Sequence, residues 1–307
     1  MSNKILAPAY FGWVHEPAIV EEVCKSDGMV AWGDTPASAL SFDDIPEYFS
    51  GAEIAEKVLG KKLPDYNQLT VGSCVGFGTT KAVEYLSLAE IHLLKDKEEF
   101  KTLAQEVTYA LSRVEIGGGR IVGDGSIGAW AAKAVKDYGV VARDKYGDLD
   151  LTKYNTDLCR KLGKVGMSKE METIARKHPV RSYTKITNWK DACVALAQGF
   201  FILVCSDRGF KSTRDEFGFA APSGSWGHCM CISGYQKKTA NNKLRNGLLI
   251  DNSWGSDWIK GPKSTIPMND GAFWADADVV DRMLAAGDSF ALSSFAGFPK
   301  RQIDWNF

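Results

Sequence analysis

The spacing of hydrophobic residues changes near the middle of the chain. After Cys74, apolar residues recur at intervals of four, three and four, at Ala82, Leu86, Ala89 and Leu93. This spacing places them on one face of a helix. Residues 98–112 and 129–139 predict two further helices, and the second ends at a glycine, as many helices do.

The second half combines helices with apolar runs typical of buried strands. Residues 169–178 and 189–198 read as helices, Asn188 is placed to cap the second, and residues 180–186 read as extended. Three apolar runs follow, at 199–206, 228–235 and 246–254. We therefore expect an α+β chain, with a mainly helical half (61–150) facing a mainly β half (151–307) across a cleft.

Residues 1–60 differ from both halves, with four prolines as breakers and one short helical candidate at 51–59. They carry many large apolar side chains, namely Tyr10, Phe11, Trp13, Val14, Ile19, Val20, Val30 and Trp32. Such side chains gain about 1.5–3 kcal/mol each when buried. We expect this extension to pack on the body or on a protein partner.

Composition narrows the choice of partners and compartment. The 307 residues carry a net charge of −1, which gives no electrostatic reason to expect nucleic acid or an anionic membrane as partner. No apolar run is long enough for a membrane span, and no signal peptide is visible at the N-terminus. The 7 cysteines are an odd, scattered set, so we expect free thiols in the cytoplasm or another reducing compartment.

Cys74 stands at the mouth of the first predicted helix, flanked by glycines at 72, 76 and 78. A lone cysteine is usually a small buried apolar residue. A thiol in the first turn of a helix, however, lies at the positive end of the helix dipole, which lowers its pKa. The glycines would leave room for another molecule to approach the sulfur. Cys74 is therefore a candidate nucleophile.

A nucleophilic thiol needs a proton partner, and His228 is the best placed of the 4 histidines because it opens a strand after a loop. Asn252 lies in the block DNSWGSDW and can orient an imidazole, while Trp254 can shield their hydrogen bond from water. A purely structural role for a single histidine is the alternative. The presence of Asn252 as a third group, beside Cys74 and His228, favours a catalytic role.

Four blocks of sequence together resemble the papain-like cysteine peptidases. They are Gln68, six residues before the cysteine; Gly72–Ser73–Cys74 with Phe77; His228 with Gly234–Tyr235; and Asn252–Ser253–Trp254–Gly255 with Trp258. The resemblance implies the papain-like fold, in which a helical subdomain and a β-barrel-like subdomain hold the active site between them. The chain departs from the family at Val75, where tryptophan is usual, and at Val71, where a disulfide-forming cysteine is usual.

The resemblance also implies a role for each matching residue. Cys74 would attack a peptide carbonyl, His228 would act as acid and base, and Asn252 would orient the imidazole. Gln68 and the Cys74 backbone N–H would form the oxyanion hole.

Residues Gly125 and Ser126 resemble the turn whose backbone binds an extended peptide substrate, with Ser126 replacing a glycine. Gly227 and Trp254 would border the same substrate. A peptide or protein substrate is implied, with no cofactor and no metal.

Two alternative functions remain open. One is another acyl-transfer enzyme on this scaffold, such as a cell-wall amidase or a transglutaminase-like protein. The other is a catalytically silent binding or assembly module, for example in a larger particle. A metal site at His228, Cys229 and Cys231 is disfavoured, because alternate side chains of a strand point to opposite faces.

Overall fold

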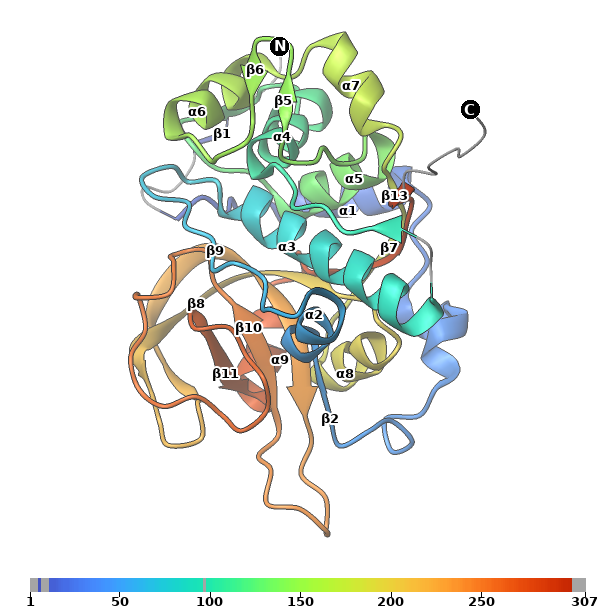
Figure 1. The fold of residues 1–307 in the computed structure, drawn as a ribbon, viewed down its shortest axis with the longest axis vertical. Helices are drawn as coiled ribbons and strands as arrows, with labels where there is room; N and C mark the ends of the chain where they lie inside the picture. Colours follow the sequence, from blue (N-terminus) through green and yellow to red (C-terminus); the bar gives the residue numbers. More distant parts are fainter. Residues whose placement is uncertain (1–4, 7–10, 96–97, 300–307) are drawn as a thin grey trace, which may run out of the picture.

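The structure is a computed structural model that describes residues 5–6, 11–95 and 98–299. Its central element is α3 (Cys74–Ala89), which crosses the molecule between a group of helices and the main sheet (Figure 1). All sixteen residues of α3 are buried. A helix covered on every side is apolar all round except where polar groups find partners. Its first residue is thus placed inside the molecule, between the two halves.

The helical half contains α4 (Gln105–Ala110), continued by a π-helical turn (Leu111–Ile116), and α5 (Gly128–Asp137). A second π-helical turn (Glu90–Leu94) extends α3. The helix predicted over 98–112 begins only at Gln105. Residues Glu98–Glu99 instead form a short strand, β3, which pairs with β13 (Phe298–Pro299). A distant partner overrides the local helical pattern here.

The helical group extends beyond residue 150. Helices α6 (Thr156–Val165) and α7 (Lys169–Ala175) begin at side-chain caps, Asn155 and Ser168. They bury an apolar cluster with α4 that includes Val107, Leu111, Leu162 and Met171. The short hairpin β5 (Lys145–Tyr146) and β6 (Leu149–Asp150) precedes them.

The main sheet is antiparallel, with strand order β11-β10-β9-β8-β12-β7 and with β2 added on β9. The strands are β2 (Tyr48–Ser50), β7 (Val180–Lys185), β8 (Ile202–Arg214), β9 (Ala220–Gln236), β10 (Gly247–Asp251), β11 (Ala272–Asp276) and β12 (Phe290–Phe295). The three predicted apolar runs overlap β8, β9 and β10. Helices α8 (Trp189–Ala197) and α9 (Ala277–Leu284) pack on the sheet, and the predicted cap Asn188 accepts a hydrogen bond from the Asp191 N–H.

The N-terminal extension is built into the body from residue 17 onward. Helix α1 (Pro17–Ser26) packs on α5, two 3-10 turns follow (Trp32–Asp34 and Pro36–Ala39), and α2 (Gly51–Leu59) packs on α3. Further upstream, β1 (Ile5–Leu6) pairs in parallel with β4 (Ile121–Val122). The extension therefore contacts both halves of the molecule.

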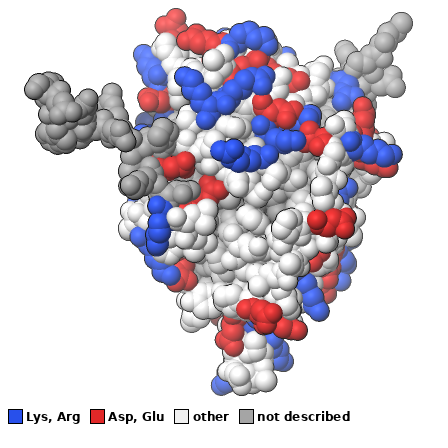
Figure 2. All heavy atoms as spheres, turned by 90° about the vertical axis from the view of Figure 1, so that its right-hand side faces the viewer, with Lys and Arg blue, Asp and Glu red and all other residues white. Residues whose placement is uncertain are grey.

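Two further features are the distribution of charged side chains on the surface and the state of the cysteines. On the face shown in Figure 2, acidic and basic side chains are interspersed around an uncharged area, and neither sign dominates. No described helix is long and apolar enough to cross a membrane. All 7 cysteines are free; Cys24 is half-buried and the rest are buried.

Candidate active site

Cys74 is the first residue of α3 and is fully buried. The glycines near it serve packing more than access. A Cβ on Gly78 would lie 2.9 Å from the Met230 carbonyl oxygen, so this glycine lets α3 approach β9 closely. A Cβ on Gly76 would similarly lie 2.9 Å from Tyr109 on α4. The expectation that all three glycines clear a path to the sulfur therefore holds at most for Gly72.

His228 and Asn252 meet in the interior where β9 runs beside the end of β10. His228 Nε2 donates to Asn252 Oδ1 at 2.7 Å, and the same oxygen accepts from the Ser253 N–H at 2.7 Å. The Trp254 ring lies 4.8 Å from the imidazole, centroid to centroid, and covers this pair. Within the described parts of the chain, the second ring nitrogen, Nδ1, has no hydrogen-bond partner of good geometry. Nδ1 is therefore the ring nitrogen that is free to exchange a proton with another group.

Gln68 is held beside these residues by Ser253. The Ser253 hydroxyl donates to Gln68 Oε1 at 2.7 Å, which fixes the side-chain amide so that Nε2 is the outer donor. Nε2 donates to the Val71 carbonyl at 2.9 Å and more weakly to the Phe11 carbonyl at 3.4 Å. The predicted oxyanion donor thus binds a backbone carbonyl oxygen of the chain itself.

The loop that carries Gly125 and Ser126 is fixed from behind. The Gly125 N–H donates to the Tyr109 hydroxyl at 2.9 Å, and its carbonyl accepts from the buried Arg113 guanidinium. Gly125 has a φ of +116°, a conformation that side chains other than hydrogen disfavour. These bonds leave the backbone of Ser126 to face the space between the two halves.

That space is occupied by residues 11–14, which we call the inserted segment. Gly12 accepts from the Ser126 N–H at 2.8 Å and Val14 donates to the Ser126 carbonyl at 2.9 Å, so the two strands pair in parallel. On the sheet side, the Trp13 N–H donates to the Gly227 carbonyl at 2.9 Å. The inserted segment is therefore an extended peptide held by the backbone groups predicted to bind substrate.

Close contact continues to the loop before Cys74. Gly12 has a φ of +105°, and a Cβ there would lie 2.1 Å from the Gly72 carbonyl oxygen, so a larger residue would not fit. The Phe11 ring lies 6.4 Å from His228 and 6.1 Å from Trp254, centroid to centroid. The sequence predicts that residues 1–60 pack on the body or on a protein partner. Within this extension, residues 11–14 lie across the candidate site.

The closed site favours neutral groups. Burial lowers the pKa of His228 to about 4, although Asn252 and the backbone of Phe11 favour the charged ring. Burial also raises the pKa of the Cys74 thiol well above its usual range. The low thiol pKa expected from the helix dipole is therefore not found in this conformation. Among the described residues, no group of histidine, cysteine or acidic side chains is arranged to hold a metal ion.

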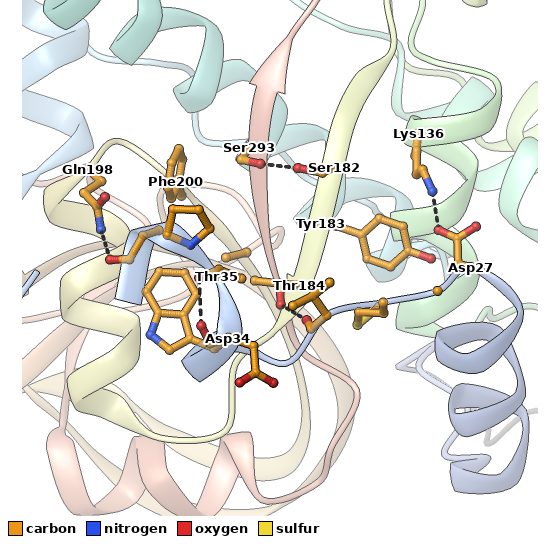
Figure 3. A pocket seen from close by; sticks show the side chains of 17 residues that line it. Asp27, Asp34, Thr35, Lys136, Ser182, Tyr183, Thr184, Gln198, Phe200 and Ser293 are labelled. Carbon is orange, nitrogen blue, oxygen red and sulfur yellow. Dashed lines mark hydrogen bonds and ion pairs between the residues drawn. The ribbon is translucent and has the colours of Figure 1, made fainter. Parts of the chain in front are cut away.

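A cavity of about 630 Å³ lies elsewhere, between residues 27–37 and strands β7 and β12 (Figure 3). Trp32, Tyr183 and Phe200 contribute its apolar lining. Its polar groups largely bind one another, as Ser182 does with Ser293 at 2.6 Å. None of the predicted site residues lines it.

The fold matches solved cysteine protease structures. Xylellain, a cysteine protease from Xylella fastidiosa, aligns with a TM-score of 0.56 and 15% identity over 95% of this chain and 96% of its own. ProCathepsin B S9 from Trypanosoma congolense gives 0.55 and 12%, over 95% of this chain and 87% of its own. Digestive procathepsin L 3 from the larval midgut of Tenebrio molitor gives 0.52 and 14%, over 94% and 84%.

No protein-family model and no curated protein sequence matches the chain. At 12–15% identity the structural likeness shows the fold alone. The predicted α+β fold of the papain-like type is confirmed, and the chain is a divergent example of it.

Three features of the site do not follow from the sequence pattern: the inserted segment, the support of Gln68 by Ser253, and a buried carboxylate, Asp288. Phe11, Trp13 and Val14 were predicted to be buried, but nothing in their spacing says against which surface. Asp288 is far from every motif in the chain, and only the fold brings it beside Trp13.

Proposed function

We propose that this papain-like chain is a cysteine peptidase that hydrolyses peptide bonds through a thioester on Cys74. The observation that carries the proposal is the buried His228–Asn252 hydrogen bond of 2.7 Å. It fixes the imidazole of His228 on β9, and Nδ1 has no partner of good geometry among residues 5–6, 11–95 and 98–299. A buried polar nitrogen without a partner is costly, so such a group usually has a functional reason.

The proposed chemistry uses only groups of this chain. The Cys74 sulfur adds to the substrate carbonyl carbon after His228 takes the thiol proton. The resulting oxyanion accepts hydrogen bonds from Gln68 Nε2 and the Cys74 N–H. His228 then gives its proton to the leaving amine, the C–N bond breaks, and a thioester remains. Water, deprotonated by His228, cleaves the thioester and returns the free thiol.

The conformation described above is a latent one within this proposal. The inserted segment covers the imidazole, binds Gln68 and pairs with Ser126 and Gly227, which a substrate peptide would need. It runs parallel to Ser126 rather than antiparallel. Its departure would readmit water and allow the thiolate–imidazolium pair to form, because desolvation is what holds both groups neutral.

Alkylation followed by peptide mapping tests the proposal. An iodoacetamide-type reagent should modify Cys74 faster than the other thiols once the inserted segment is displaced, and Cys74→Ala should abolish cleavage of an unstructured peptide library. A Cys74 that stays unreactive, together with no cleavage of any library member by the displaced form, would leave the assembly-module alternative in its place.

A further inference from the structure

We propose that Asp288 selects the substrate by binding a basic side chain in the space now filled by the Trp13 indole. This inference rests on the proposed peptidase function. It concerns what the site accepts rather than how it cleaves. The chain's own Trp13 occupies this space and bonds to Asp288.

Trp13 shows where a side chain of a bound peptide goes. Its backbone is held between Ser126 and Gly227, and the whole residue is 2% exposed. At the inner end, Nε1 donates to Asp288 Oδ2 at 2.8 Å. An extended peptide that replaced the inserted segment on the same backbone groups would direct a side chain toward the same carboxylate.

Asp288 is a carboxylate in need of a positive partner. It is fully buried and accepts from the N–H groups of Gly128 and Ala129, each at 2.7 Å. Within the described residues, no lysine or arginine forms an ion pair with it. Lys185 acts on it only through a longer-range attraction. Burying an anion without a cation is costly, so an ammonium or guanidinium group that reaches it gains a strong, charge-assisted hydrogen bond.

The competing explanation is that Asp288 only caps α5. Its two backbone hydrogen bonds lie at the first turn of that helix, where an acidic group is favourable. The chain offers a matched control for this role. Asp281, on α9, accepts from the Trp189 N–H at 2.7 Å at the start of α8. If Asp288 selects the substrate, replacing it changes how labelling rates depend on the charge of the peptide. If it only caps α5, that dependence stays the same.

The test uses full-length protein carrying Gly12→Val to displace the inserted segment. Peptidyl epoxides with arginine, citrulline or norleucine at either of the two positions before the reactive group are compared by their rates of Cys74 labelling. We expect arginine to exceed norleucine by about 10- to 100-fold, the range of a hydrogen bond to a charged group. Citrulline, which has the shape of arginine without its charge, should lie near norleucine.

Asp288→Asn should reduce the arginine preference to about threefold or less, while Asp281→Asn should leave it unchanged; these limits follow from loss of the charged bond alone. Thermal melting of each variant checks its fold. An arginine preference that survives Asp288→Asn, or no preference in the parent, would overturn the inference and leave Asp288 as a helix cap.

Binding of the corresponding fluorescent peptides to the Cys74→Ala form separates the two proposals. If no epoxide labels Cys74, the peptidase proposal fails, but the arginine-to-norleucine ratio of binding constants still decides the role of Asp288. Equal binding of both peptides would reject the inference without any reference to catalysis.

Discussion

Two neighbouring parts of the N-terminal extension are held to the molecule in different ways. Residues 17–59 contribute Val20, Trp32 and Ile54 to the main core, and β2 joins the main sheet beside β9. The inserted segment also contributes Trp13 and Val14 to this core, but its backbone bonds go to Ser126 and Gly227, the groups that would bind a substrate in the proposed function. One part is an element of the fold, whereas the other, under the proposed function, occupies the site that a substrate would take over.

Burial alone therefore does not show whether a segment is a structural element or the occupant of a binding site. A side chain in a core has no competitor, because its removal leaves a cavity. A peptide bound by backbone groups has a competitor in every other peptide, and its hold depends on what its side chains add. The predictions below are ordered from the largest expected effect to the smallest, and each one tests a side of this comparison.

The first concerns residues 17–59. Ile54→Ala in α2 should lower the free energy of unfolding by about 2–5 kcal/mol, because it removes a nearly buried side chain packed against α3. Chemical denaturation measures the change. The alkylation rate of Cys74 in the folded protein should not rise. A folded Ile54→Ala protein with a freely reactive Cys74 would show that α2, too, holds the site closed.

The second concerns the inserted segment. Gly12→Val introduces a side chain that would overlap the Gly72 carbonyl, at a φ of +105° that valine disfavours. Displacing the segment should raise Cys74 alkylation by about 30- to 100-fold and should lower the melting temperature, because Trp13 and Val14 leave the core. Gly33→Val is the matched control, since no atom of the residues that the structure describes lies within 4 Å of its added Cβ and its φ is not positive. Equal labelling of the two variants would contradict a closed site.

Features that depend on residues close together in the sequence could be predicted, whereas features that depend on distant contacts could not. Helix α3, the strand containing His228 and the cap at Asn188 follow from periodicity and side-chain chemistry over a few residues. The four motif blocks predicted the papain-like fold correctly. The catalytic roles of Cys74, His228, Asn252 and Gln68 remain predictions, although the structure brings the last two together through Ser253.

What could not be predicted is non-local. Residues 98–99 lie in a stretch with a helical pattern, yet they pair with β13 from the other end of the chain. The aromatic residues at 11 and 13 signal burial but not location. The low thiol pKa expected from the helix start assumed an open site, and burial of Cys74 raises its pKa instead.

The third prediction concerns pH. Burial raises the pKa of Asp288 to about 6, above its usual value near 3.8, so the folded state binds this proton more tightly than the unfolded state. Its contribution to stability is present at low pH and is lost as pH rises through 6. His228 acts oppositely: its pKa is lowered to about 4, so its contribution is present above about 6.5 and is lost toward pH 4.

The two groups therefore offset each other between pH 4 and 6.5. Asp288→Asn removes one of them, so the variant should lose roughly 1–3 kcal/mol more stability than wild type on acidification from pH 7 to pH 4. Urea denaturation at both pH values measures this difference, in which all other groups cancel. Parallel pH curves for the two proteins would show that Asp288 titrates normally while Trp13 is bound.

The smallest expected effect isolates one hydrogen bond of the inserted segment. Trp13→Phe keeps an aromatic ring next to His15, which lies 4.8 Å away, but removes the N–H that binds Asp288. Losing one hydrogen bond to a buried carboxylate, while the backbone bonds persist, should raise Cys74 alkylation by about 3- to 10-fold. In an Asp288→Asn background the same change should have a smaller effect, because the charged acceptor is already gone. Alkylation rates of the four proteins form a double-mutant cycle. Additive effects would show that the backbone bonds to Ser126 and Gly227 hold the segment without help from Asp288.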